Sequence, residues 1–291
     1  MTAAVSLAWV DGRVVAAERA VVPAADRGFL LGDGLFETLR VRRRRAFRLE
    51  AHLRRMAEGS RRLGIPLPAG IREAVDELLE AARPDGEGEA ALRVTLTRGS
   101  GGEGLDLPPE PRPRLVATLR PARPLPERLL ERGLGLRCSD HRLGSRSALA
   151  GIKSLAYLPN VLARAEARAA GADDALLLDD RDRVVAASAS NVFWVGADGE
   201  LRTPSPDCGI LAGITRAAVL DLVAARGIPS VQGTWTAGEL SAAREAFTTS
   251  SLRGIAPVTR LEGLPVGDGR VGALTRRIRD DYEEIVRQET A

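Results

Sequence analysis

Lysine is almost absent from this sequence. Of its 42 lysines and arginines, only Lys153 is a lysine. Arginine can carry any solvated positive charge, but a guanidinium cannot lose its proton and attack a carbonyl carbon, whereas a desolvated lysine can become a neutral amine. A single lysine in the short apolar segment 150–155 therefore has two interpretations. It is either a leftover surface residue or a lysine retained for Schiff-base chemistry, and the other motifs decide between them.

Cysteine, histidine and long apolar runs are also scarce. Two cysteines, Cys138 and Cys208, cannot form a disulfide framework, and the only histidines are His52 and His141. Such a set does not complete a tetrahedral metal site. No apolar run approaches the ~18 residues of a membrane helix, and the first residues have no basic segment typical of a signal peptide. We expect an enzyme without a bound metal or a membrane segment, located in the cytoplasm.

Aromatic residues make up only 3% of the chain, beside 44% hydrophobic and 28% charged residues. The net charge is +3, and nearly all of the positive residues are arginines. So small an excess of positive charge is weak evidence for a nucleic-acid partner. The four-arginine run 42–45 lies between two strand-like segments, so a solvated hairpin tip is favoured over a nucleic-acid patch. An arginine-rich nucleic-acid binder is the least favoured function, and no nucleic-acid partner is expected.

The length of 291 residues suits two domains. Strand and helix patterns alternate without a regular period, which predicts an α/β (α+β) fold. Prolines 121, 124 and 126 suggest a linker at 121–126, with an N-terminal domain at 1–120 and a C-terminal domain at 127–291 that contains Lys153. The predicted helices are 49–63, 71–82 (ended by Pro84), 155–170, 213–226 and 271–288, with a capping box at 236–239. The predicted strands are 5–10, 13–15, 35–41, 46–49, 91–97, 114–119, 133–138, 175–178, 184–187, 191–195 and 245–249.

The glycine-rich segment 99–104 matches G-x-G-x-x-G after a predicted strand. A dinucleotide-binding fingerprint must open a helix, whose N-terminus holds the pyrophosphate. Pro108 and Pro109 follow too closely for that. The segment is therefore interpreted as a mobile loop over a site.

Two segments have features suited to phosphate. Gly213, Ile214 and Thr215 lie where a helix is predicted to begin, and free N–H groups, the helix dipole and a hydroxyl there favour an anion. The hydroxyl run 248–251 leaves a predicted strand and forms a second candidate. Each is individually more typical of a cap or a turn. Together with a single lysine, they suggest an aldehyde cofactor that is anchored by its phosphate.

Four motifs occur in an order that resembles a known family. They are residues 26–38, 150–155, 190–193 and 211–216. The set resembles the fold-type IV pyridoxal-phosphate enzymes, or class IV aminotransferases, and spans most of the chain. The resemblance implies a two-domain fold like that of D-amino-acid aminotransferase, pyridoxal 5'-phosphate between the domains, and a homodimer whose partner completes the substrate wall.

The resemblance also implies roles for individual residues. Lys153 would form the Schiff base and shuttle the proton, and Arg55 would bind the phosphate. Leu211 would pack on the pyridine ring, and Tyr157 would bond the phenolic oxygen. The other phosphate-cup residues would be Gly213, Ile214, Thr215, Ser250 and Ser251. Weaker substrate candidates are Phe36, Thr38 and Arg98.

Within the family, the loop 98–104 and the segment 141–144 ahead of Lys153 look most like aminodeoxychorismate lyase. This enzyme of folate biosynthesis converts 4-amino-4-deoxychorismate to 4-aminobenzoate and pyruvate. The alternative is a branched-chain or D-amino-acid aminotransferase, although the Arg-x-His motif of the latter is not visible.

One position departs from the family pattern. The family places a glutamate five residues before the asparagine of Ser-Asn-Val-Phe, where it bonds the pyridine nitrogen. Here that position is Ala186, and neither neighbour is acidic. A weaker electron sink would follow. A pyridoxal-phosphate-binding protein with little activity is therefore a third possibility.

Overall fold

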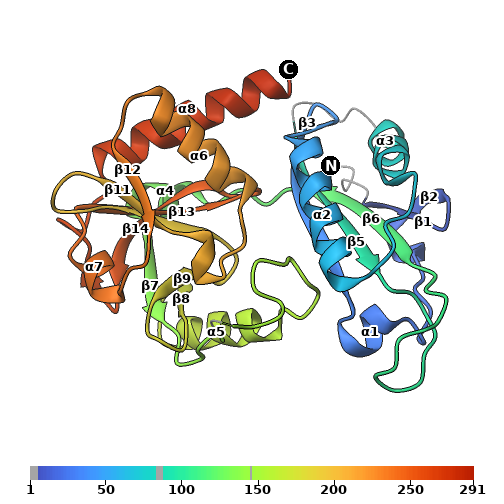
Figure 1. The fold of residues 1–291 in the computed structure, drawn as a ribbon. Coiled ribbons are helices and arrows are strands. Elements are labelled where there is room, and N and C mark those ends of the chain that lie inside the picture. The colour runs from blue at the N-terminus through green and yellow to red at the C-terminus, as the bar shows by residue number, and fades with distance from the viewer. Residues whose placement is uncertain (1–5, 83–87, 145) are drawn as a thin grey trace. The chain divides into compact units, whose positions relative to one another are not determined.

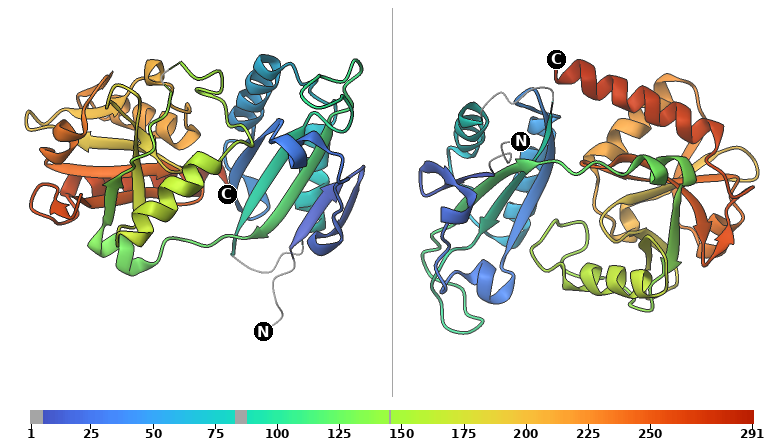
Figure 2. Two further views of the ribbon diagram at one scale, coloured as in Figure 1. Left: turned by 90° about the horizontal axis from the view of Figure 1, so that it is seen from below. Right: turned by 180° about the vertical axis from the view of Figure 1, so that it is seen from behind.

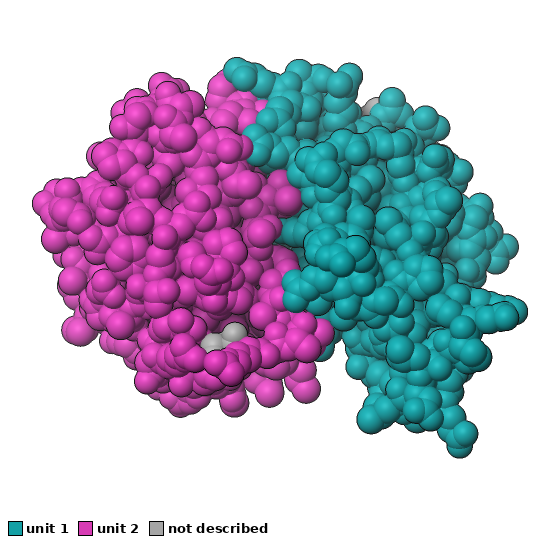
Figure 3. Space-filling model, viewed as in Figure 1, with its two compact units in different colours: residues 1–123, 152–156, 287–291 teal, residues 124–151, 157–286 magenta. Residues whose placement is uncertain are grey.

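The computed structural model describes residues 6–82, 88–144 and 146–291. Contacts within the chain divide it into two units (Figure 3). Unit 1 comprises residues 1–123, 152–156 and 287–291, and unit 2 comprises residues 124–151 and 157–286.

Helices and strands occur throughout both units (Figure 1). The α-helices are α1 (Arg27–Leu31), α2 (Leu49–Leu63), α3 (Ile71–Ala81), α4 (Glu127–Arg132), α5 (Leu158–Ala169), α6 (Ile214–Ala225), α7 (Ala237–Ser241) and α8 (Ala273–Glu289), with 3-10 turns at Ala17–Arg19 and Pro206–Cys208. The strands are β1 (Leu7–Val10), β2 (Arg13–Ala16), β3 (Gly34–Arg42), β4 (Arg45–Ala46), β5 (Glu89–Thr97), β6 (Arg114–Pro121), β7 (Leu134–Cys138), β8 (Asp174–Leu178), β9 (Val184–Ala187), β10 (Asn191–Val195), β11 (Leu201–Pro204), β12 (Ser230–Gly233), β13 (Glu245–Ser250), β14 (Gly254–Leu261) and β15 (Leu264–Pro265).

Unit 1 is built on an antiparallel sheet with strand order β2-β1-β6-β5-β3-β4. Helices α2 and α3 cover one face of it (Figure 1). Leu35 and Leu39 of β3 point to these helices and pack with Met56 of α2 and Leu78 of α3. Because side chains of a strand alternate between faces, Phe36 and Thr38 point to the opposite face.

Unit 2 contains a mixed sheet with strand order β12-β11-β10-β13-β14-β7-β8-β9, and β15 pairs with β14. Its largest core cluster includes Leu136, Leu176, Trp194 and Val258, which come from four different strands. Helix α5 packs on β7 and β8, as the further views show (Figure 2). Ala163 and Ala167 of this helix contact the sheet through their small side chains.

The mixed α/β fold class predicted from the sequence is confirmed. Helix α2 has the predicted bounds and ends at Gly64, which has φ +61°. The arginine run forms the predicted hairpin tip, with Arg42 paired to Arg45 and exposed side chains at 43 and 44. The starting residue of the first predicted strand, Val5, and the helix stop Pro84 lie outside the described residues.

Several elements differ from the sequence prediction: helices α1 and α4 and strands β11, β12 and β15 were not predicted. Two further differences have a clear physical reason. Helix α5 begins at Leu158, because the preceding residues 152–156 bond to unit 1 instead of coiling. Strand β14 was not predicted. It contains Pro257, which is atypical of a strand with neighbours on both sides, yet it pairs with β13 and β7.

Among the described residues, no helix combines the length and the apolar character needed to cross a membrane.

Candidate active site

Lys153 lies in a short segment that attaches to β3. The backbone N–H of Phe36 donates to the carbonyl oxygen of Lys153, and the N–H of Leu155 donates to that of Gly34, both at 2.9 Å. A side chain at Gly34 would meet the carbonyl oxygen of Leu96 at 2.5 Å, so this close approach requires glycine. These contacts group residues 152–156 with unit 1, whereas the sequence pattern assigned Lys153 to the C-terminal domain. The reason is the pairing with β3, which no local pattern reveals.

The amine of Lys153 lies beside an aromatic ring and a second cation. Its Nζ is 4.3 Å from the ring centre of Phe36, and the guanidinium carbon of Arg93 is 3.7 Å from the same ring centre. Burial, the nearby cations Arg55 and Arg93 and the opposing carboxylate of Glu37 together set the pKa of Lys153 at about 8, with burial the largest cause. Roughly a tenth of the amine is therefore neutral at pH 7, far more than for an unperturbed lysine, and only the neutral form is a nucleophile.

A buried ion cluster lies on the helix-facing side of β3. The carboxylate of Glu37 accepts from Nε and Nη2 of Arg55 at 2.8 and 2.6 Å, and from Nδ1 of His52 at 2.7 Å. Burial alone would raise the pKa of Glu37, but the bonds from Arg55 and His52 hold it below its ordinary value. Burial lowers the pKa of His52, so its ring is neutral and donates through Nδ1. Arg55 is thus oriented by a carboxylate, which leaves its predicted phosphate contact a proposal.

The opposite face of β3 is polar near Lys153. Thr38 is half-buried and pairs directly with Arg93 of β5, so the two side chains lie on the same face as Phe36. Arg93 also donates from Nε to the hydroxyl of Thr95 at 3.2 Å. An amine, a hydroxyl and a guanidinium are therefore gathered on this face of unit 1.

Arg98 does not join this group. It is 5% exposed, and its guanidinium donates to Asp33 and to the carbonyl oxygens of Leu63 and Gly64 at the end of α2. These bonds give Arg98 a structural role, and its contact with a substrate stays a prediction. The physical reason is that α2 ends with unpaired carbonyl groups, and a buried guanidinium satisfies two of them.

Unit 2 contains the candidate phosphate cup at the N-terminus of α6. Gly213 is the N-cap residue, and no side chain caps the helix there. The N–H groups of Ile214 and Thr215 therefore belong to the set that has no partner inside the helix. A side chain at Gly213 would collide with Oδ1 of Asn191, so the chain turns here against that amide.

Asn191 connects the cup to the adjacent strands of unit 2. Its Nδ2 donates to the carbonyl oxygen of Leu211 at 2.9 Å, which holds the segment before α6 against β10. Asn191 pairs directly with Thr249 of β13. Strand β13 ends at Ser250, and Ser251 begins the turn that follows. The predicted cup residues therefore lie on connected elements, and their contacts with a cofactor remain a prediction.

Two further predicted positions lie in unit 2. Tyr157 is the half-buried N-cap residue of α5, and its contact with a phenolic oxygen remains a prediction. Ala186 of β9 pairs with Leu177 and packs against the cluster of Val185, Cys208 and Ile210. This cluster adjoins the segment that leads to Leu211.

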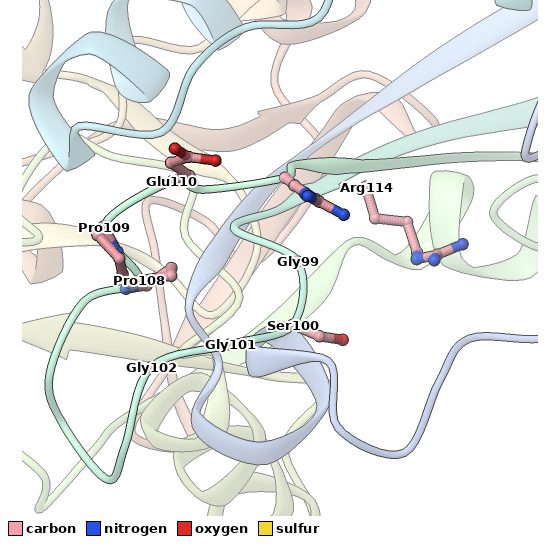
Figure 4. A pocket seen from close by; sticks show the side chains of 9 residues that line it. Gly99, Ser100, Gly101, Gly102, Pro108, Pro109, Glu110 and Arg114 are labelled. Atoms are coloured by element: carbon pink, nitrogen blue, oxygen red, sulfur yellow. The ribbon is translucent and has the colours of Figure 1, made fainter.

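The glycine-rich loop does not join the residues around Lys153. Its segment 99–102 and the returning segment 108–114 line a cavity of about 510 Å³ (Figure 4). Buried Arg27 anchors this loop. Its Nη1 donates to the carbonyl oxygens of Gly101, Gly104 and Asp106. None of the predicted cofactor residues lines this cavity.

Within the described ranges, no three His, Cys, Asp or Glu side chains form a group suited to a metal.

A family model for amino-transferase class IV matches residues 34–261. The chain belongs to this family. A Methanocaldococcus jannaschii protein provisionally named a branched-chain-amino-acid aminotransferase is 34% identical over 278 residues, or 95% of each chain. A solved 4-amino-4-deoxychorismate lyase from Pseudomonas aeruginosa is 39% identical, with a TM-score of 0.83 over 96% of this chain and 98% of that one. The Escherichia coli branched-chain amino acid aminotransferase is 26% identical, with a TM-score of 0.91 over 99% and 96%.

Class IV aminotransferases use pyridoxal 5'-phosphate, and this chain is an enzyme that depends on it. The residues fit that cofactor. Lys153 offers an amine with a lowered pKa to the aldehyde. The uncapped start of α6, with Ile214 and Thr215, offers N–H groups to a phosphate.

Three contributors were missed by sequence reasoning. Glu37 and His52 form the cluster with Arg55, and Arg93 shares the ring of Phe36 with Lys153. His52 and Arg55 are three residues apart on a predicted helix and therefore lie on one face of it. This spacing was the sequence feature that could have grouped them. Their partner Glu37 comes from another element and could not be identified locally.

The first prediction concerns the amine of Lys153. Because only the neutral form attacks an aldehyde, the rate of covalent cofactor attachment to the cofactor-free protein should rise with pH, with its midpoint near 8. Arg93→Met removes a nearby cation and should move the midpoint upward. Stopped-flow absorbance over a pH series measures it. Lys153→Arg should abolish attachment. Borohydride-reduced cofactor found on any residue other than Lys153 would refute the assignment.

The second prediction concerns anchoring. Arg55→Ala should weaken cofactor binding by about 1.5–3 kcal/mol, and Thr215→Ala by about 1 kcal/mol, because backbone donors remain. Equilibrium titration measures both. Arg54→Ala, at the exposed neighbouring position, is the matched control. Since Arg55→Ala also leaves Glu37 buried without its cation, urea unfolding of the cofactor-free variants separates stability from binding. Equal affinity in all four proteins would show that the phosphate binds elsewhere.

Proposed function

We propose that this enzyme is an aminodeoxychorismate lyase, which converts 4-amino-4-deoxychorismate to 4-aminobenzoate and pyruvate. The observation that supports it is the polar face of unit 1, where Lys153 and Arg93 lie at the ring of Phe36 and Thr38 pairs with Arg93. The 39% identity to a 4-amino-4-deoxychorismate lyase over 96% of the chain supports the same reaction. A homodimer, a cytoplasmic location and a place in folate biosynthesis belong to this proposal.

The reaction removes a proton from the carbon that bears the amino group and breaks the adjacent C–O bond to the enolpyruvyl group. When bound, pyridoxal phosphate supplies an aldehyde that takes up the amino group and a ring that withdraws electrons from the C–H bond. Lys153 Nζ, neutral near its lowered pKa, accepts this proton. The Thr38 hydroxyl donates a proton to the departing group, and Arg93 holds a substrate carboxylate. One proton is lost and one gained, so no oxidant is required.

Ala186 is compatible with a lyase. Transamination stores charge on the cofactor ring and gains from a carboxylate at its nitrogen, which a methyl side chain does not provide. Release of 4-aminobenzoate creates an aromatic ring in the product, and this gain assists bond cleavage. The lyase reaction therefore depends less on the group at position 186 than transamination does.

A branched-chain or D-amino-acid aminotransferase is the alternative. The names and similarity of the M. jannaschii protein and of a Bacillus licheniformis D-alanine aminotransferase, which is 29% identical over 287 residues, favour it. A pyridoxal-phosphate-binding protein with little activity is the remaining alternative, and Ala186 is the observation that favours it.

The third prediction tests the lyase. Purified enzyme given 4-amino-4-deoxychorismate should release 4-aminobenzoate, followed by fluorescence, and pyruvate, followed by a coupled reduction, in equal amounts. Thr38→Val keeps the shape but removes the hydroxyl, and should slow the reaction by roughly 10²-fold, the lower range for general acid catalysis. Thr38→Ser should restore most of the rate. Rapid transamination of an L- or D-amino acid, without 4-aminobenzoate release, would replace the lyase with the aminotransferase.

The fourth prediction concerns position 186. Half-transamination by the native enzyme should be slow with all L- and D-amino acids. Ala186→Glu should accelerate it by at least about tenfold, because a well-aimed charge in a dry site is worth roughly 10²–10³ in rate. Ala186→Gln has the same size without the charge and is the control. Single-turnover absorbance measures all three proteins, and a fast native reaction with no gain from the glutamate would show that another group serves the ring nitrogen.

A further inference from the structure

Arg216 is a buried cation that has only neutral partners. It is 5% exposed, and its Nη2 donates to the carbonyl oxygen of Pro204 at 2.8 Å and to Oε1 of Gln232 at 2.7 Å. Its Nε is buried without a hydrogen-bond partner. Over the residues that the structure describes, no Asp or Glu forms an ion pair with this guanidinium. Burial accordingly lowers the pKa of Arg216, with no carboxylate opposing it.

The position of Arg216 in its helix makes this arrangement less favourable still. It is the third residue of α6, so it lies about 3 Å along the axis from Ile214. The first turn of a helix carries partial positive charge, which disfavours a cation there. The helix also has no side-chain cap at Gly213. Positive charge therefore accumulates at this N-terminus, and in the described part of the chain no carboxylate pairs with Arg216.

A second buried polar group lies on β13, the strand next to Asn191. Thr249 is 2% exposed, and its hydroxyl has no hydrogen-bond partner. It pairs directly with Asn191, and directly paired residues of adjacent strands point to the same face. The amide of Asn191 contacts Leu211 and adjoins Gly213. The hydroxyl of Thr249 thus lies on the sheet face where Asn191 holds the segment before α6.

We propose that Arg216 is the counter-charge of a phosphate dianion bound at the N-terminus of α6. Its role is electrostatic: its bonds to Pro204 and Gln232 hold the charge in place, while the N–H groups of Ile214 and Thr215 make the direct contacts. Thr249 adds a hydroxyl to the same anion site, directly or through water. The inference rests on the proposed use of this cup for the phosphate of the cofactor, and it extends the cup to residues that the motifs did not indicate.

The test compares two ligands that differ only in the phosphate. Cofactor-free enzyme is titrated with pyridoxal 5'-phosphate and with pyridoxal, which both react with Lys153. Arg216→Gln removes the charge, but its amide can still donate to Pro204 and Gln232. It should lower the affinity for pyridoxal phosphate by about tenfold, the scale of a partly buried charge at a helix end, and leave pyridoxal binding nearly unchanged. Arg216→Lys should retain the preference.

A second variant tests the charge without removing Arg216. Gln232→Glu places a carboxylate on the guanidinium and should reduce the preference for pyridoxal phosphate in the same way. It should also stabilise the cofactor-free protein and weaken the thermal protection that inorganic phosphate gives the native enzyme. Arg226→Met, at the exposed far end of α6, is the matched control.

The preference for pyridoxal phosphate over pyridoxal decides the inference. An unchanged preference in both Arg216→Gln and Gln232→Glu overturns it, whatever the catalytic activity. A reduced preference in an enzyme that releases no 4-aminobenzoate supports the role of Arg216 and rejects the lyase. Protection by inorganic phosphate that is lost in Arg216→Gln, without any difference between the two pyridoxal ligands, identifies a free-phosphate site and also overturns the inference.

Discussion

The attachment of residues 152–156 to β3 is the constraint on which the chemistry of unit 1 depends. Two backbone hydrogen bonds, between Phe36 and Lys153 and between Leu155 and Gly34, fix the lysine beside an aromatic ring. There it loses solvation, and the pKa falls from 10.5 to about 8. A lysine on a solvated loop would be almost fully protonated at neutral pH and could not react with an aldehyde. Backbone pairing thus creates the nucleophile.

Two buried charged groups, Glu37 in unit 1 and Arg216 in unit 2, differ in how the protein compensates them. In unit 1, the carboxylate of Glu37 is balanced by Arg55 and by a donor from His52, so this cluster is complete within the protein. In unit 2, Arg216 has neutral partners, and the hydroxyl of Thr249 has none among the described residues. A completed cluster orients its members. A buried cation without a carboxylate favours an anion from outside, which is the basis for the proposed role of Arg216.

Local patterns predicted those elements that depend on neighbours in the sequence. Helix α2 was predictable from its apolar spacing and its terminal glycine, and the hairpin at Asp11 and Gly12 from its turn residues, which both have positive φ. Strand β14 was not, because Pro257 weakens the local signal and its pairing with β13 and β7 comes from distant segments. The late start of α5 has the same cause, since bonds to β3 compete with the helix.

The sequence by itself determined the chemical groups and the family. A single lysine, the order of the glycine and hydroxyl motifs, and Ala186 in the place of a glutamate are properties of the residues, and no fold is needed to read them. Tertiary structure decided what each group can do. In the folded chain, Arg98 bonds the last carbonyl groups of α2, and Glu37 pairs with Arg55. Arg93 and Thr38 lie on the same sheet face as Lys153. Solvation and ion pairing depend on contacts between residues far apart in the chain, so they exist only once the sheets have formed.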